Sequence, residues 1–224
     1  YLYYNYDGGG LSDNAFDAIQ YILKKRRDRK NRSFEKIGAE PVEKIRTQLP
    51  FPMPSLNKVK PGEISLLKFL TANHSLAWSL KLDGVSAMIT FKNGKVDKMY
   101  TRGDGSIGGD VTYLKKHVKN IPKKVTADYV VRGEFMISKR VWEEKYINSG
   151  YSNPRALVSG KVNSGTISPA MNDIEFIAYS IIKIGNRKEV PSPSHAFNIL
   201  SSENFVTVEN GSFFYPTVQQ IATL

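Results

Sequence analysis

Hydrophobic and polar residues alternate along several short stretches in the middle of the chain. This period of two is typical of β-strands that bury one face. Strand-like patterns occupy residues 76–84, 85–91, 95–105, 129–137 and 173–182. The second and third of these are joined by Asn93-Gly94, a dipeptide typical of a two-residue hairpin turn. We therefore predict a largely antiparallel sheet.

Helical periodicity is found on both sides of these strands. Ser12 is a suitable helix N-cap, and Ala15, Ile19 and Ile22 follow it at helical spacing. Further helices are predicted at residues 63–73, 110–119, 139–149 and 194–203. Five prolines within residues 41–62 exclude a long helix there and favour an extended connector. The predicted fold class is α+β, with mainly antiparallel sheets and flanking helices, preceded by a small helical subdomain.

Composition narrows the function classes. Hydrophobic residues make up 41% and charged residues 24% of the 224 residues, which is typical of globular proteins and excludes collagen and coiled coils. No apolar run approaches the ~18 residues of a membrane span. The chain has no cysteine, which excludes disulfides and cysteine-ligated zinc and fits an intracellular protein. The formal net charge of +11 suits an anionic partner such as nucleic acid, although solubility alone would also account for it.

The most site-like pattern is Lys81-Leu82-Asp83-Gly84, at the end of a predicted strand. Alternation places Ser79, Lys81 and Asp83 on one face of that strand. The other face is apolar and is expected to join the core: Trp78, Leu80 and Leu82. A lysine and an aspartate on one face beside a glycine turn could form a reactive site. They could equally form a surface ion pair worth ~0.2–1 kcal/mol.

A second strand has a similar arrangement. Arg132 and Glu134 point to one face, while Gly133 between them permits close approach of a neighbouring backbone. A cross-strand salt bridge would explain the same charges. A further strand ends in Thr101-Arg102-Gly103-Asp104-Gly105, whose glycines predict a tight turn that presents Arg102 and Asp104.

The predicted N-terminal helix carries paired carboxylates. Asp13 and Asp17 are four residues apart and share one helical face, with Phe16 beside Asp13. Tyr3 and Tyr4 precede them in the chain. A solvated first turn and a polar pocket for hydroxyls or a cationic ring are both compatible with this pattern.

Short segments follow one another in a specific order between Leu2 and about Tyr179: YLYYNYD, LSDNAFD, IGAEP, PMPSLN, LKLDG, TRGDGSIGGDVT, VRGEFM and NPRALVSG. This order resembles an NAD-dependent DNA ligase. The KxDG element alone is also found in ATP-dependent ligases, RNA ligases and capping enzymes. The Tyr-Tyr…Asp-x-x-Phe-Asp element is similar to a small N-terminal domain that only the NAD-using branch carries.

The resemblance implies a nucleotidyltransferase, ATP-grasp-like adenylation domain in residues 49–224, preceded by a nicotinamide-mononucleotide-binding subdomain in residues 1–48. In this family the lysine of KxDG, here Lys81, attacks the adenylyl phosphorus of NAD, and nicotinamide mononucleotide leaves. AMP then passes to the 5′-phosphate of a nick in double-stranded DNA, and the 3′-hydroxyl displaces it. NAD and Mg²⁺ are the implied cofactors, because Mg²⁺ would neutralise phosphate charge. The expected partner is nicked double-stranded DNA, and no membrane association is expected. The protein is expected to be a monomer in the cytoplasm or at the site of DNA replication.

The same resemblance assigns roles to individual residues. Lys81 is the nucleophile, and Asp83 orients it or helps to hold magnesium. Arg102 faces the nucleotide, Glu134 faces the ribose or the metal, and Arg155 faces the phosphates. The adenine side is lined by Ser55 and Leu56. The nicotinamide mononucleotide half is bound by Tyr3, Tyr4, Asp13, Phe16 and Asp17.

Three positions differ from the family pattern. Ser79 stands where the family usually has a glutamate that contacts adenine, Phe16 replaces a usual tyrosine, and Asn163 stands near the place of a later arginine. Residues 179–224 contain no DGxVxK element, so we expect a fragment that does not seal nicks alone. Two alternatives stay open: an ATP- or GTP-using lysine nucleotidyltransferase, and a nucleotide- or nucleic-acid-binding module without catalysis.

Overall fold

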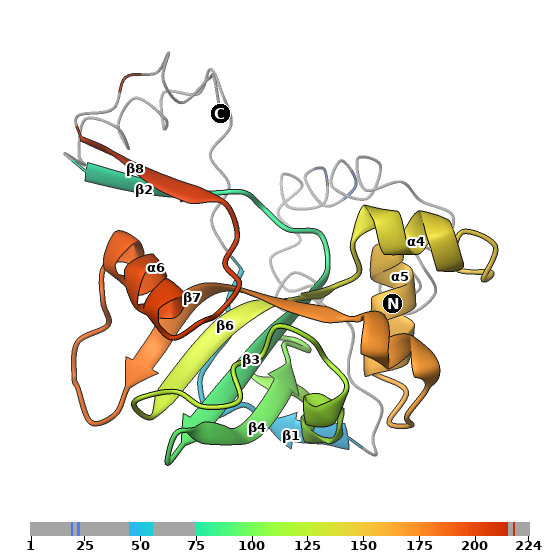
Figure 1. Cartoon of the computed structure of the whole chain (residues 1–224), viewed down its shortest axis with the longest axis horizontal. Helices are drawn as coiled ribbons and strands as arrows, with labels where there is room; N and C mark the ends of the chain where they lie inside the picture. The colour runs from blue at the N-terminus through green and yellow to red at the C-terminus, as the bar shows by residue number, and fades with distance from the viewer. Residues whose placement is uncertain (1–18, 20–21, 23–44, 56–74, 215–216, 218–224) are drawn as a thin grey trace.

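The computed structural model describes residues 19, 22, 45–55, 75–214 and 217 (Figure 1). Its strands are β1 (Arg46–Gln48), β2 (Ser75–Ser79), β3 (Val85–Lys92), β4 (Lys95–Thr101), β5 (Ile107–Asp110), β6 (Tyr129–Met136), β7 (Glu175–Ile184) and β8 (Asn210–Phe214). Its helices are α4 (Lys139–Lys145), α5 (Pro154–Val162) and α6 (Pro193–Ser202), with 3-10 helices η4 (Thr112–Lys116) and η5 (Pro169–Asp173). Of the predicted N-terminal helix, Ile19 and Ile22 are described, and both are helical. The helix predicted at residues 63–73 lies outside the described residues.

The larger sheet has six strands in the order β1-β5-β4-β3-β6-β7, and all neighbouring strands are antiparallel (Figure 1). The predicted hairpin joins β3 to β4. Its turn residues Asn93 and Gly94 have φ angles of 51° and 73°, the left-handed conformation that an Asn-Gly hairpin turn requires. The predicted α+β class with antiparallel sheets is therefore confirmed.

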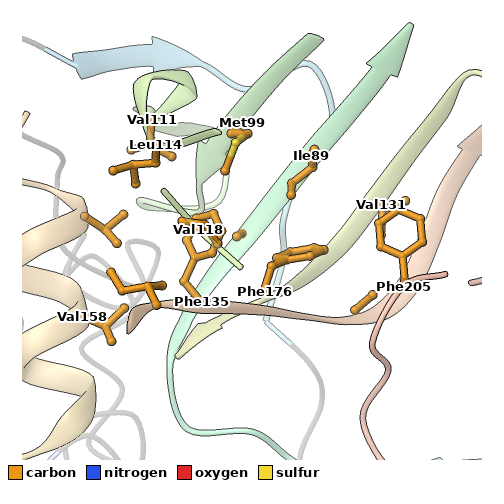
Figure 2. Packing of buried hydrophobic residues seen from close by; sticks show 14 of the residues in the cluster. Ile89, Met99, Val111, Leu114, Val118, Val131, Phe135, Val158, Phe176 and Phe205 are labelled. Atoms are coloured by element: carbon orange, nitrogen blue, oxygen red, sulfur yellow. The ribbon is translucent and has the colours of Figure 1, made fainter. Parts of the chain in front are cut away.

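The main hydrophobic core lies on one face of this sheet, under the helices. Phe135 of β6 and Phe176 of β7 pack edge to face with ring centroids 5.8 Å apart, and Phe205 lies 6.5 Å beyond Phe176 (Figure 2). The helices add buried side chains to the same cluster, among them Trp142 of α4, Leu157 of α5 and Leu200 of α6. This packing makes the sheet a rigid support for groups at its edges.

Gly133 explains how β6 and β7 come so close. A Cβ atom at this position would lie 2.4 Å from the Ile177 carbonyl oxygen and 2.4 Å from the Phe176 ring. The predicted close approach of backbone at Gly133 is confirmed. It sits between Arg132 and Glu134, which face away from the core, as the alternation predicts.

The opposite face of the sheet carries a smaller apolar cluster. Met88 of β3 and Val130 of β6 are buried there against Leu49 and Met53, with Phe51, Tyr100 and Ile182 packed around them. We call residues 51–55 the strap, because this proline-rich segment lies against the sheet on the side away from the main core. The predicted extended connector is thus extended here and also contains the short strand β1.

The helices were predicted with mixed success. Residues 139–149 and 194–203 contain α4 and α6, whose N-cap residues, Ser138 and Ser192, accept hydrogen bonds from the Val141 and His195 N–H groups. The α-helix predicted at residues 110–119 is wrong, because Asp110 ends β5 and the 3-10 helix η4 follows at Thr112–Lys116. Helix α5 was missed, although Asn153 at the N-cap and Pro154 at the first helical position are a helix-start signal. In the part of the chain that the structure describes, no helix combines the length and apolarity that crossing a bilayer requires.

One prediction about the core is wrong. Trp78 is half-buried outside both buried clusters, and the side chain of Leu80 is 48% exposed. The reason is that β2 does not join the large sheet but pairs with β8 in a separate two-stranded sheet (Figure 1). Leu82, beyond the end of β2, does pack against the main core.

Candidate active site

Lys81 and Asp83 lie on the connection between β2 and β3. Strand β2 ends at Ser79, so the prediction that the strand runs into the KLDG motif is wrong by a few residues. Lys81 and Asp83 are nevertheless both exposed. Gly84 then brings the chain against β6: a Cβ atom there would lie 2.3 Å from the Phe135 carbonyl oxygen and 2.8 Å from Glu134 Cγ. Only glycine fits this approach without displacing β6, which places the motif beside Glu134.

Asp83 forms an ion pair with Arg155. The distance from Arg155 Nη1 to Asp83 Oδ1 is 3.0 Å, and the side chains are 56% and 74% exposed. Helix α5 positions the arginine, because Asn153 caps the helix by accepting from the Ala156 N–H at 2.8 Å. Such an exposed pair contributes less than about 1 kcal/mol, so it orients side chains more than it stabilises the fold.

Lys81 is not paired with Asp83. Within the described residues, Lys81 makes no hydrogen bond or ion pair, so the surface ion pair considered from the sequence is not formed with this aspartate. The carboxylate of Asp83 is directed to Arg155 instead. The amine of Lys81 therefore has no carboxylate partner among the described residues.

Glu134 is the buried acid of this cluster, with 8% of its surface exposed. Ser86 Oγ, its cross-strand neighbour on β3, donates to Glu134 Oε2 at 3.1 Å. Burial raises the pKa of Glu134 to about 6, and the Ser86 hydroxyl, the positive charges of Arg155 and Lys81 and the Gly84 N–H all oppose that rise. Gly84 packs on Glu134 and so brings the KLDG motif beside it, and the charge of Arg155, at the start of α5, also acts on this acid. Among the described residues neither Arg132 nor Glu134 forms the cross-strand salt bridge considered from the sequence, and the cross-strand partner of Glu134 is the Ser86 hydroxyl.

Tyr179 of β7 belongs to the same cluster but was not selected from the sequence. Burial raises the pKa of Tyr179 to about 12, and the negative charge of Glu134 adds to the effect. Ser86 interacts with the Tyr179 hydroxyl and with Glu134. Tyr179 stands in an alternating strand pattern whose sequence gives no sign that this face borders a site.

Arg102 and Ser55, two of the residues that the resemblance assigns to the nucleotide site, are in contact. Arg102 Nη2 donates to Ser55 Oγ at 2.7 Å, and Arg102 Nε donates to the Met53 carbonyl oxygen at 3.1 Å. The tight turn after Arg102 is confirmed, with Gly103 at a φ of 54°. Asp104 is not presented outward, since its Oδ1 accepts from the N–H groups of Ser106 and Ile107 within the turn.

Other predicted site residues lie elsewhere. Ser79 ends β2 opposite Asn210, and no described contact joins it to the Lys81 cluster. Asn163, at the end of α5, accepts from Thr101 Oγ1 at 3.3 Å and so ties α5 to β4. The remaining predictions lie outside the described residues: Tyr3, Tyr4, Asp13, Phe16, Asp17 and Leu56.

The carboxyl groups around Arg155 could hold a magnesium ion together with substrate phosphates. Mg²⁺ needs only one or two carboxylates when phosphate oxygens complete its coordination. Asp83 is bonded to Arg155, and Glu134 lies within its electrostatic influence, so the donor set fits. The described ranges contain no cluster of three or more His, Asp or Glu side chains that could hold a metal by themselves.

The family model of the NAD-dependent DNA ligase adenylation domain matches residues 64–223. This range includes Lys81, Asp83, Arg102, Glu134 and Arg155. The chain belongs to the NAD-dependent DNA ligase family, as an adenylation domain.

Curated relatives of this adenylation domain are themselves called DNA ligase. This chain is 36% identical over 189 residues to the DNA ligase of Acanthamoeba polyphaga mimivirus, and the match covers 81% of this chain and 29% of the relative. It is 30% identical over 242 residues to the DNA ligase of Blochmanniella pennsylvanica, a match that covers 92% of this chain and 40% of the relative. It is 29% identical over 230 residues to the DNA ligase of Metamycoplasma arthritidis, a match that covers 91% of this chain and 33% of the relative. The chain spans about a third of the length of these relatives.

Glu134→Gln is expected to stabilise the adenylation domain at pH 7 by about 1–2 kcal/mol. Because the pKa of Glu134 is raised from 4.5 to about 6, the folded protein holds this proton more tightly than the unfolded chain does. That contribution is present below pH 4.5 and is lost as the pH rises through about 6. Glutamine carries no charge and keeps an oxygen for the Ser86 hydroxyl. Urea unfolding, followed by tryptophan fluorescence across this range, should show a flatter pH dependence for the variant.

The matched control for this prediction is Glu143→Gln, on the exposed surface of α4. Its pH dependence should follow the unmodified protein. Equal slopes for Glu134→Gln and the unmodified protein between pH 4.5 and 6 would show that Glu134 ionises alike in the folded and unfolded states.

Proposed function

We propose that this chain is the module that takes adenylate from NAD in a DNA ligase. Lys81 Nζ attacks the adenylyl phosphorus, the new N–P bond forms, and the bond from phosphorus to the oxygen of nicotinamide mononucleotide breaks. The amine loses its proton to solvent. The observation that carries this proposal is the amine of Lys81, which has no partner among the described residues, beside an orienting ion pair, Asp83–Arg155, and a buried acid, Glu134.

The surrounding groups have complementary tasks in this proposal. Arg155 offers a planar guanidinium whose remaining N–H groups suit phosphate oxygens. Glu134, supported by Ser86, is placed to accept hydrogen bonds from ribose hydroxyls or to share a metal ion. Ser55 of the strap borders the nucleotide together with Arg102, which donates to its hydroxyl. Mg²⁺ held between Asp83, Glu134 and the substrate would neutralise phosphate charge.

The nicotinamide half of the substrate is assigned to the N-terminal segment. We place a nicotinamide-mononucleotide-binding subdomain at residues 1–48 and the adenylation domain at residues 49–224. Aromatic faces can stack on the pyridinium ring, and carboxylates can take its ribose hydroxyls. The residues proposed for this are Tyr3, Tyr4, Asp13, Phe16 and Asp17.

The acceptor of the adenylate is proposed to be the 5′-phosphate of a nick in double-stranded DNA. The relatives carry the name DNA ligase, and the net charge of +11 favours a polyanionic partner. A monomeric protein inside the cell, in the cytoplasm or where DNA is replicated, fits this role. We do not expect residues 1–224 alone to complete nick sealing, since they span about a third of the relatives.

Covalent adenylate tests the proposal directly. The protein in its natural full length is incubated with Mg²⁺ and NAD, ATP or GTP in separate reactions, and its intact mass is measured. A mass increase of one adenylyl group with NAD alone is the expected result. An adduct with ATP or GTP but not with NAD would place the protein among other lysine nucleotidyltransferases, and the absence of any adduct would favour a binding module.

A further inference from the structure

Two arginine side chains attach the strap to the sheet in addition to the apolar packing of Phe51 and Met53. Pro52 and Pro54 have no N–H group, so this segment cannot pair as an ordinary strand. Arg132 Nη2 donates to the Pro52 carbonyl oxygen, and Arg102 Nε donates to the Met53 carbonyl oxygen at 3.1 Å. Two consecutive carbonyl groups of the strap therefore each receive a guanidinium N–H.

Arg132 occupies an unusual position for a charged side chain. It is half-buried opposite Met88 in the β3–β6 pairing, and its buried Nε has no hydrogen-bond partner among the described groups. Desolvation lowers the pKa of Arg132, and the positive charge of Arg102 acts in the same direction. An apolar side chain would pack on Met88 without this desolvation cost. What the guanidinium adds at this place is its hydrogen bond to the strap.

A continuous series of contacts leads from the strap to the buried acid. The Ser55 hydroxyl accepts from Arg102 Nη2 at 2.7 Å. The backbone N–H of Arg102 donates to the Ser86 carbonyl oxygen at 3.0 Å, and the Ser86 hydroxyl donates to Glu134 Oε2 at 3.1 Å. A displacement of the strap would therefore also shift Arg102 and the groups around Glu134.

We infer that Arg132 is a positioning residue of the nucleotide site: by holding the Pro52 carbonyl, it fixes the strap and thereby places Ser55 and Arg102 against the bound nucleotide. Arg132 itself does not touch the nucleotide. The inference rests on the proposed function for the identity of the ligand, but the attachment of the strap can be tested without it.

Arg132→Met in the full-length protein tests both parts. Methionine keeps the apolar packing on Met88 and removes the donors. We expect the Met53 amide, which donates to the Gly105 carbonyl at 2.8 Å, to exchange with solvent ~10-fold faster or more, the scale of one lost hydrogen bond to a charged group. The Leu49 amide, bonded to the Ser106 carbonyl oxygen at 2.9 Å, is the internal reference and should change less than ~2-fold, since the described contacts of Arg132 reach Pro52 and not Leu49. NMR hydrogen exchange gives both rates.

The kinetic readout is self-adenylation with NAD. For Arg132→Met we expect KM for NAD to rise ~10-fold while the maximal rate changes less than ~3-fold, because the site is assembled less often but the chemistry is unchanged. Arg132→Lys keeps one strong donor, so its Met53 exchange rate and its KM for NAD should both lie close to those of the unmodified protein. Arg140→Met on α4, whose exposed partner is Glu144, is the matched control and should alter neither readout.

Each outcome decides the inference. Unchanged exchange at Met53 in Arg132→Met would show that the strap does not depend on this arginine and would overturn it. A raised KM with unchanged Met53 exchange would mean that Arg132 acts on the substrate directly. Faster Met53 exchange with an unchanged KM would mean that the position of the strap does not affect NAD binding. Both results contradict the inference. If the unmodified protein forms no adduct with NAD, the proposed function fails, whereas the exchange result still tests the attachment.

Discussion

Lys81→Ala is expected to abolish covalent adenylate, a loss on the order of 10³-fold or more, because the proposed function makes the Lys81 amine the group on which the N–P bond forms. Intact mass after incubation with NAD and Mg²⁺ measures the loss, and peptide mapping of the unmodified protein should place the adduct on Lys81. The described contacts support the choice, since Asp83 is engaged by Arg155 and leaves this amine without a carboxylate partner in the described residues.

Lys81→Arg separates chemistry from electrostatics. The guanidinium keeps a positive charge near Glu134 but is a poor nucleophile at neutral pH, since it remains protonated. We therefore expect the same loss of adduct with little change in thermal stability. Lys95→Ala is the matched control, because this exposed lysine follows the hairpin turn at the opposite end of β3. Persistent labelling of Lys81→Ala at wild-type level would show that another residue is the nucleophile.

Local patterns in the sequence were sufficient for the parts of the fold that depend on neighbouring residues. The Asn93-Gly94 turn joins β3 to β4 as predicted, because its left-handed conformations are a property of those two residues. Arg132 and Glu134 face away from the core because side chains alternate in β6. The KLDG and RGD turns were identified from their glycines, and the glycines at both places are in close contact with backbone atoms.

Features that depend on distant partners were not predictable in this way. The exposure of Leu80 follows from the pairing of β2 with β8, whose sequence lies near the other end of the chain. The ion pair between Asp83 and Arg155 depends on how α5 docks, and Tyr179 reaches the site through the β6–β7 pairing. None of these contacts has a local signature, whereas the family resemblance did supply Arg155 because it draws on whole folded proteins.

Ser79 shows where resemblance and structure must be combined. It stands at the position of the family's usual adenine-contacting glutamate, yet it lies at the end of β2 without a described contact to the Lys81 cluster. The groups that the structure gathers near Glu134 are instead Ser86, Tyr179 and, through Ser86, Arg102. Recognition of the base in this chain is therefore expected to depend more on the strap and on these neighbours than on the residue two positions before the lysine.

Gly84→Ala is expected to reduce adduct formation ~10²-fold or more, because a misplacement of about 1 Å at a reacting group has effects of this size. The new Cβ would lie 2.3 Å from the Phe135 carbonyl oxygen, so either β6 or the Lys81 connection must move. The connection is the exposed and less constrained of the two, so it should move and carry the Lys81 amine away from its position near Glu134. We also expect the free energy of unfolding to fall by about 1–3 kcal/mol, the usual cost of an extra methyl in a packed place.

The control for Gly84→Ala separates backbone strain from displacement of the site. Gly150→Ala meets no atom within 4 Å but has a φ of 84°, so its cost of about 1 kcal/mol arises from the left-handed backbone alone. It should lower the free energy of unfolding and leave adduct formation unchanged. Circular dichroism and urea unfolding, run beside the mass assay below the unfolding transition of each variant, distinguish the two effects. If folded Gly84→Ala formed the adduct at the wild-type rate, the packing of Gly84 against β6 would not be what positions Lys81.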